Sequence, residues 1–525
     1  MKSVLTHYLL MAALSLLISP NLGTSAPKTS KWDKQLEKIL QAYRKGQYSK
    51  KKSWVFLNQL SRNSRFLSTQ SRSRLKAAQA QLLYNDKYPI LASLYASESI
   101  LISAKPLEKE NSTTWKVLRK ASKEIPIDFV VDRLALKFIG INKVPKYFRN
   151  DWNYMIGTAL LNQGKNDQAA AYFSRLNLKN RYFLSSQYQL AMIEFEKNNF
   201  KQSEVYLRTI LDKSSQKVSP LPRKRRKELV NYARIALARI FYEQGKFLES
   251  AYHYRRVKKN STLFYDALFE QSWALFMAGK PRYALGTLHS ATSPYFKDMY
   301  NPEAKVLEST AFFWLCRYDD ARNSLADFAA KHSETVGGLQ DFLDRQRLTP
   351  ERSYQLFEDL ISKVSGTSLG ISRELLETAA QQDSMLLARE QYASVIDELK
   401  RLKKRGLYKS KKGRKVLEER LLALATKLQN EIGRVFLLEL QAMNESFNIM
   451  YNQAQFLYIE LLMGQKEQLL GRDLHNQGKT IKNIKQLKSW GQKTQTWTDL
   501  KEEYWWDEIG FQVLDVEPLC NEQEG

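Results

Sequence analysis

Cysteine and histidine are scarce in this 525-residue sequence, and their scarcity excludes several classes of protein. Two cysteines, Cys316 and Cys520, are too few for a scaffold held together by disulfides. In an oxidising compartment they could bridge each other; the alternative is that Cys316 is a small buried residue and Cys520 a free thiol. The histidines have no cysteine partners and no i, i+4 pairing, so the sequence predicts no metal site and no cofactor.

Recognisable catalytic motifs are also missing. Residues 366–370 match the G-x-S-x-G pattern formally, but a nucleophile elbow needs a strand before the serine within an α/β sheet. The surrounding sequence has a helical pattern, and neither a phosphate-binding loop nor a dinucleotide fingerprint is present. We therefore expect a protein that is not an enzyme and takes no small-molecule substrate.

Long apolar runs are absent beyond the N-terminus. Lys2 precedes the apolar run Leu9–Ile18, Pro20 ends it, and small residues follow up to Ala26, as in a secretory signal peptide spanning residues 1–26. The run is shorter than the roughly 20 residues that cross a bilayer, although an uncleaved anchor is the alternative. The pattern predicts an exported, periplasmic protein.

Acidic residues are too few to balance the basic ones: 55 stand against 82, which gives a net charge of +27. Such an excess favours anionic partners, here an anionic cell-wall or membrane surface, while export argues against nucleic acid. Two basic clusters stand out, although a solvated loop is the alternative interpretation of each. They comprise Arg223, Lys224, Arg225 and Arg226, and Lys403, Lys404, Arg405, Lys411 and Lys412.

A short pattern of a small residue, a turn residue and a second small residue recurs along the chain. Consecutive copies lie 34 residues apart, except for an insert before the third copy and a three-residue delay before the fifth. This period is typical of stacked helix pairs, in which the small residues let the two helices of a pair approach closely. The copies are Gly157, Gly164 and Ala169; Ala191, Asn198 and Ser203; Ala238, Gly245 and Ser250; Ser272, Gly279 and Ala284; and Ser309, Cys316 and Ala321.

The repeat resembles the tetratricopeptide repeat family in its period, its small positions and its turn glycines. It departs from that family in lacking the usual tryptophan near each helix start and the usual proline at each repeat end. Residues 265–270, 293–296, 302–304 and 315–321 are further similar to exported tetratricopeptide proteins of predatory and gliding proteobacteria. Some of those proteins belong to gliding-motility machinery, so the resemblance implies a periplasmic scaffold.

These patterns predict an all-α protein: a helical solenoid followed by a long, coiled-coil-like antiparallel hairpin. Residues 46–48 and 86–88 resemble the later turns, so we expect weaker repeats before the main array. The expected segments are a signal peptide at 1–26, degenerate helical repeats at 27–148, the array at 149–332, an irregular helical linker at 333–380, the hairpin at 381–475 and an aromatic-rich tail at 476–525. We expect that tail to fold back onto the helical body.

Stacked helix pairs line an inner surface with the first helix of each pair, and here that surface is rich in aromatic side chains. Aromatic and arginine side chains are enriched in protein interfaces, although filling of the solenoid core is the alternative. The predicted groove residues are Tyr154, Tyr188, Phe195, Tyr232, Arg239, Tyr242, Phe269, Trp273, Phe276, Phe313 and Trp314.

The sequence therefore predicts a non-enzymatic periplasmic scaffold that holds envelope proteins together, with gliding-motility-like machinery as one setting. An assembly factor that sits on the outer membrane or cell wall through its basic surfaces is the first alternative. A cell-wall hydrolase is the second alternative, although no residues of the sequence support it.

Overall fold

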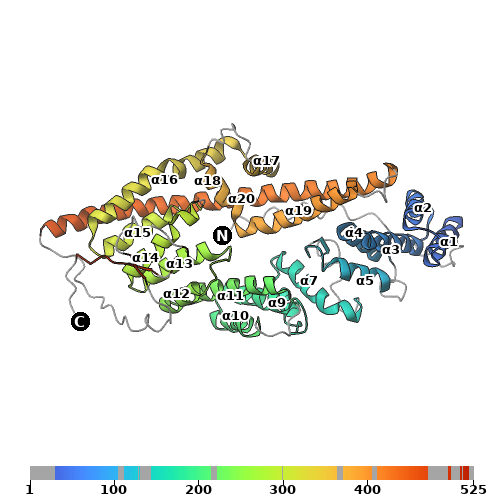
Figure 1. Ribbon diagram of the computed structural model, residues 1–525, viewed down its shortest axis with the longest axis horizontal. Helices are drawn as coiled ribbons and strands as arrows, with labels where there is room; N and C mark the ends of the chain where they lie inside the picture. Colours follow the sequence, from blue (N-terminus) through green and yellow to red (C-terminus); the bar gives the residue numbers. More distant parts are fainter. Residues whose placement is uncertain are drawn as a thin grey trace.

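A computed structural model of the chain describes residues 30–103, 112–127, 129–130, 144–214, 221–297, 299–362, 371–404, 411–470, 495–497, 506, 509–510 and 512–519. The predicted signal peptide and residues 366–370 lie outside this part. The described residues confirm the all-α solenoid (Figure 1). No described helix is both long enough and apolar enough to cross a membrane.

Paired helices form the solenoid, and a helical hairpin follows it. The N-terminal pairs comprise α1 (Lys31–Arg44), α2 (Lys50–Arg62), η1 (Ser64–Phe66), α3 (Thr69–Asn85), α4 (Pro89–Ile102) and α5 (Ser112–Ala121). The array comprises η5 (Lys146–Phe148), α7 (Arg149–Leu161), α8 (Asn166–Phe173), α9 (Phe183–Glu196), α10 (Phe200–Ser214), α11 (Arg223–Glu243), α12 (Phe247–Arg255), α13 (Phe264–Met277), α14 (Pro281–Ala291), η6 (Pro294–Phe296), α15 (Glu303–Trp314) and α16 (Tyr318–Gln346). The remaining elements are α17 (Pro350–Ile361), α18 (Arg373–Gln381), α19 (Asp383–Lys404), α20 (Lys411–Leu469), β1 (Gln495–Trp497) and β2 (Gln512–Leu514).

One turn geometry joins the two helices of each repeat. The turn residue has a positive φ, a conformation that costs glycine least and that helix C-termini commonly adopt. The next backbone N–H donates to the carbonyl five residues earlier, as from Lys165 to Leu160 at 3.0 Å. The weaker turns predicted in the N-terminal repeats share this geometry. The residues concerned are Gly46, Lys87, Gly164, Asn198, Gly245, Gly279 and Cys316.

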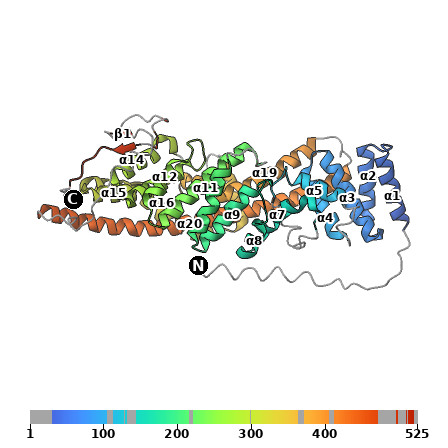
Figure 2. The same cartoon turned by 90° about the horizontal axis from the view of Figure 1, so that it is seen from below.

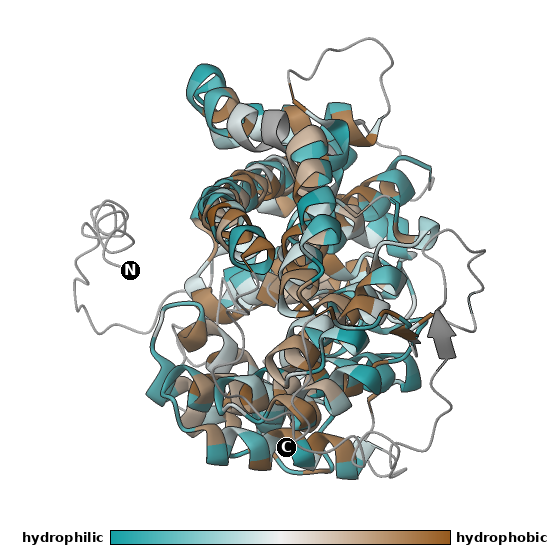
Figure 3. Ribbon diagram, turned by 90° about the vertical axis from the view of Figure 1, so that its left-hand side faces the viewer, coloured by the Kyte–Doolittle hydropathy of each residue, from teal (hydrophilic) through white to brown (hydrophobic). Residues whose placement is uncertain are grey.

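The small repeat positions are buried where the paired helices touch. A Cβ added to Gly157 would lie 2.6 Å from the Phe173 ring, so only glycine fits there without a shift. Two of the serines at such positions bond across the pair: Ser203 Oγ donates to the Ala191 carbonyl at 2.7 Å, and Ser309 Oγ to that of Ala321 at 2.7 Å. In the view along the long axis, single helices carry both hydrophilic and hydrophobic segments, as expected for helices that pack through one face (Figure 3).

The described part of the segment expected as an irregular linker at 333–380 is helical over longer stretches than predicted. Helix α16 runs through Gly337 and Gly338 to Gln346, because its packing against α20 outweighs the low helix propensity of glycine. Leu339 and Phe342 fix this part of α16 in the core that it shares with α20. Helices α17 and α18 continue the packing against α20.

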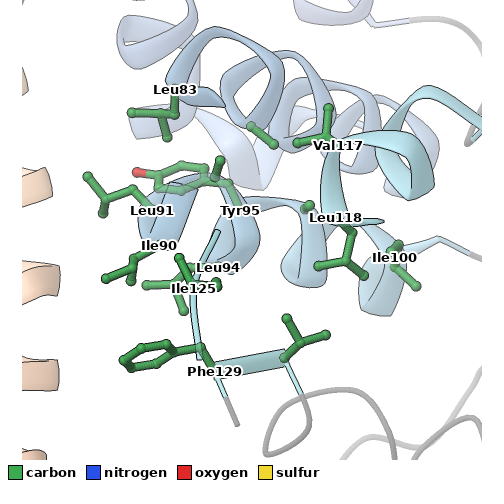
Figure 4. Close-up of a cluster of buried hydrophobic side chains, with 14 of the residues drawn as sticks. Leu83, Ile90, Leu91, Leu94, Tyr95, Ile100, Val117, Leu118, Ile125 and Phe129 are labelled. Carbon is green, nitrogen blue, oxygen red and sulfur yellow. The ribbon is translucent and has the colours of Figure 1, made fainter. Parts of the chain in front are cut away.

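Helices α19 and α20 form the predicted hairpin and run along the long axis of the molecule beside the array (Figures 1 and 2). One end packs against α15, α16 and α17. The other end packs on the N-terminal repeats, where Val395, Leu399, Leu417 and Leu421 join their hydrophobic core. Figure 4 shows that core around α4, with Leu91, Leu94 and Tyr95 pointing into it. The hairpin therefore bridges the two ends of the solenoid.

Glu398 of α19 makes a buried polar contact between the hairpin and the N-terminal repeats. Its two carboxyl oxygens accept hydrogen bonds from the backbone N–H groups of Ile90, at 2.9 Å, and Leu91, at 2.8 Å. These groups open α4, whose own N-cap residue, Tyr88, provides no side-chain cap. Glu398 is fully buried and caps α4 from another element.

The described part of the tail folds back onto the array, as predicted. Strand β1 pairs in parallel with β2, and β2 lies against α14. Ile509 is fully buried among Phe264, Leu268 and Ala291, and the N–H of Gly510 donates to Ser290 Oγ at 3.1 Å. This small sheet is an addition to the expected all-α architecture.

Candidate binding site on the inner face of the array

Five predicted groove residues line two cavities between the array and helix α19. They are Tyr154 on α7, Tyr188 and Phe195 on α9, and Tyr232 and Arg239 on α11. All five side chains are partly or largely exposed, and together they define what we call the inner face. These five residues lie on the first helices of three consecutive repeats, and their role in binding a partner stays a prediction.

The first cavity has a volume of about 830 Å³. Tyr188, Phe195, Tyr232 and Arg239 form its array side, together with Met192 and Ile235. The loop between α12 and α13, the start of α19 and Trp506 of the tail close its other sides. Its walls thus combine aromatic, methionine and arginine side chains, which are the types enriched in protein interfaces.

The second cavity, of about 930 Å³, lies further toward the N-terminal repeats and shares Tyr232 with the first. Tyr154, Leu161 and Tyr182 line it from the array, and burial raises the pKa of Tyr182 to about 12. Charges of both signs reach this cavity, so it favours a partner of mixed charge over a polyanion. They come from Lys123, Glu124, Arg181, Arg225, Glu228, Glu390 and Asp397.

A charge-assisted network orients the arginine of the inner face. Arg239 donates to the two carboxylate oxygens of Glu270, from Nη2 at 2.6 Å and from Nε at 2.8 Å. The Tyr254 hydroxyl donates to the same carboxylate at 2.7 Å. The guanidinium is thereby held in one orientation although 57% of its side-chain surface is exposed. Hydrogen bonding to Glu270 also raises the pKa of Arg239, so it stays charged at any physiological pH.

Six predicted groove residues do not line either of these two cavities, and their part in a binding groove stays a prediction. Trp273 packs edge-on against Phe276, and Phe276 against Trp314, so these rings stack along consecutive first helices. The Trp273 indole N–H donates to Glu303 at 2.9 Å, which satisfies it within the protein. Phe269 joins the same cluster, Phe313 packs on Tyr318, and Tyr242 packs on Phe247. These aromatic rings pack against neighbouring side chains within and between repeats, and all six remain at least partly exposed, Trp314 at 48%.

Helix α19 supplies the wall that the sequence analysis missed. Leu386, Leu387 and Arg389 face the cavities, and Leu386 and Leu387 keep 38% and 51% of their surface exposed. A signal was available, because both leucines lie outside the apolar stripe that packs α19 onto α20. Their facing the array depends on the long-range fold of the hairpin, which local periodicity does not encode.

The basic clusters occupy separate places. Arg223, Lys224 and Arg225 are exposed in the first turn of α11, and Arg226 is partly buried there. Lys403 and Lys404 are exposed at the end of α19, whereas Arg405 lies outside the described residues. Lys411 and Lys412 begin α20. Except for Arg225, which reaches the second cavity, these clusters are not part of the inner face.

Cys316 is disulfide-bonded. The chain's other cysteine, Cys520, lies outside the described residues. Leu519 precedes Cys520, and Leu315 precedes Cys316. The backbone N–H of Leu519 donates to the Leu315 carbonyl at 2.9 Å, so the residues before the two cysteines lie next to each other.

No protein-family model matches the chain, and a search of the curated proteins found no match to it.

Proposed function

We propose that this protein is a non-enzymatic scaffold that binds segments of partner proteins between its inner face and α19. The observation that carries the proposal is that Tyr154, Tyr188, Tyr232 and Arg239, all of them at least partly exposed, line two adjoining cavities of about 930 and 830 Å³. Cavities of this size that combine aromatic walls with a few oriented polar groups bind ligands or polypeptide segments. A segment with apolar side chains and charges of both signs fits this lining best.

We further propose that the scaffold works in the cell envelope. The N-terminal sequence has the features of a secretory signal, and disulfide-bonded cysteine is typical of oxidising compartments outside the cytosol. The period of 34 residues supports membership of the tetratricopeptide repeat family, whose solenoids act as interaction modules. An envelope complex such as gliding-motility machinery is one setting that this proposal allows.

The experiment that tests the proposal starts by identifying the partner. A photo-crosslinking residue replaces Tyr188 or Phe195 inside the first cavity and, as a control, Val205, which is 51% exposed on α10. We expect one defined envelope protein to be crosslinked from positions 188 and 195 and not from 205. Equal crosslinking from all three positions would remove the inner face as the binding site.

A second candidate function follows from the first turn of α11. Arg223, Lys224 and Arg225 are exposed at the positive end of the helix dipole, and no acidic residue accompanies them in that turn. This arrangement is unfavourable for the helix and favours an anionic surface such as peptidoglycan or a membrane. It would make the protein an assembly factor that sits on the cell wall or outer membrane.

For that candidate we expect binding to isolated peptidoglycan at low salt that is lost at high salt, measured by co-sedimentation. Changing Arg223, Lys224 and Arg225 to glutamine should weaken binding several-fold. Changing the equally exposed Lys34, Lys38 and Lys51 on or near α1 and α2 is the matched control, since it removes the same charge elsewhere. Equal losses in both triple variants would show that only the net charge matters.

A further inference from the structure

The C-terminal end of α20 carries an exposed apolar stripe that the proposed scaffold function does not use. Its members are Ile449, Phe456, Ile459, Leu462, Met463, Leu469 and Leu470, with exposures between 47% and 88%. The opposite side of the same helix is packed: Leu457 and Leu461 are buried against the array, and Gly464 meets the Tyr318 ring. Figures 1 and 2 show this end of α20 extending past α15 at one end of the molecule.

The spacing of the stripe indicates what covers it. Ile449, Phe456, Met463 and Leu470 follow one another at intervals of seven residues, and Leu462 and Leu469 directly precede the last two of them. The position three residues after each of the first three is apolar at Ile459 and polar at Asn452 and Lys466. A seven-residue apolar repeat is the pattern of a helix that packs along another helix, and a polar Asn or Lys in such a seam is tolerated. Exposed isolated leucines are ordinary in proteins, but a row of this length marks an interaction surface.

A membrane surface fits the stripe less well than a helix. Helices that lie on anionic membranes carry lysine and arginine beside their apolar face. Beside this stripe stand two acidic residues, Glu460 and Glu467, and one basic residue, Lys466. The local charge is therefore −1, in a chain whose overall charge is +27. The polar flank thus lacks the charge that would hold it on an anionic bilayer.

We infer that the stripe pairs with the same stripe of a second copy of this chain, with the two helices antiparallel and the molecules end to end. The seven side chains expose roughly 100 Å² each, or about 700 Å² per molecule, close to the ~800 Å² per partner of a standard stable interface. A surface that pairs with itself about a twofold axis needs only one such patch. Because the stripe lies at one end of the molecule, antiparallel overlap directs the two bodies away from each other.

The test measures the mass of the purified full chain in solution by light scattering after size-exclusion chromatography, across a range of concentrations. We expect a dimer for the native chain. Phe456→Glu together with Met463→Glu places charges in the stripe, at the interface between the two copies, and should weaken dimerisation by at least about a hundredfold. Val205→Glu together with Ile361→Glu changes two similarly exposed apolar residues elsewhere and should leave the dimer intact.

Circular dichroism checks that the variants keep their helix content. A native chain that is monomeric at all concentrations, or a seam variant that still dimerises, would overturn the inference. Vesicle co-sedimentation that depends on Phe456 and Met463 would also overturn it, by assigning the stripe to a lipid surface. Loss of dimerisation leaves crosslinking from Tyr188 unaffected, so this test is independent of the proposed function.

Discussion

The backbone of α17 packs closely on α20 at a single glycine, Gly433. A Cβ added to Gly433 would lie 1.8 Å from the Pro350 carbonyl oxygen, and backbone cannot move aside as a side-chain tip can. We expect Gly433→Ala to lower the free energy of unfolding by about 3 kcal/mol, measured by urea denaturation. Gly337→Ala is the matched control, because a Cβ there meets no atom within 4 Å; it should be neutral or stabilise α16 by up to about 1 kcal/mol. Equal effects of the two substitutions would contradict the close contact.

The conformation of residues at repeat positions could be predicted from the sequence, whereas contacts between elements distant in sequence could not. The positive φ of Asn198 and Cys316 could be expected because both occupy the position of a turn glycine. Nothing in the sequence around Gly433 marks it as different from Gly337. The difference lies in which helix passes by, and that is fixed by contacts distant in sequence.

At the scale of elements, the docking of the hairpin tip on α4 should depend on pH. Burial raises the pKa of Glu398 to about 7, against an ordinary value of 4.5, despite the N–H groups of Ile90 and Leu91 and the nearby Arg401. Below pH 4.5 the carboxyl is protonated in both the folded and the unfolded chain. Between 4.5 and 7 the unfolded chain releases the proton and the folded chain keeps it, so stability falls as the pH rises.

Glu398→Gln tests this prediction, since the amide cannot titrate. We expect the native chain to lose up to about 3 kcal/mol relative to the variant as the pH rises from 4.5 to 7, followed by urea denaturation. Comparing how steeply the free energy of unfolding changes with pH in the two proteins removes the contribution of the other titrating groups, which both proteins share. The same pH dependence in both proteins would show that Glu398 is ionised in the fold.

The sequence predicted most elements of the fold and about half of the candidate site. The period located the helix pairs, and the apolar stepping in α19 and α20 located the hairpin. The split of the groove aromatics was not predictable: Tyr188 and Trp273 stand on equivalent helices with similar neighbours in sequence. Both side chains are partly buried, but Tyr188 faces the start of α19 across a cavity, whereas the Trp273 indole N–H donates to Glu303 of the next repeat.

At the scale of the whole molecule, the hairpin adds contacts that an ordinary solenoid lacks. Stacked repeats contact only their neighbours, so an ordinary solenoid can bend along its length. Here α20 packs on α15, α16 and α17, and Arg420 reaches Glu98 of α4 at 2.6 Å. The hairpin thus connects the two ends of the solenoid, and α19 covers part of the inner face instead of leaving it as an open groove. Such pre-organisation lowers the entropy lost when a partner segment binds.

The central claim is that this inner face binds a partner protein, and a titration tests it most directly. The partner crosslinked from position 188 is purified and its affinity measured for the native chain, for Tyr188→Ala with Tyr232→Ala, and for the Val205→Ala control. We predict that the double variant binds at least about tenfold more weakly, because two aromatic contacts at the centre of the site are lost. The control should bind as the native chain does. Unchanged affinity in a double variant that keeps its helix content would contradict the claim.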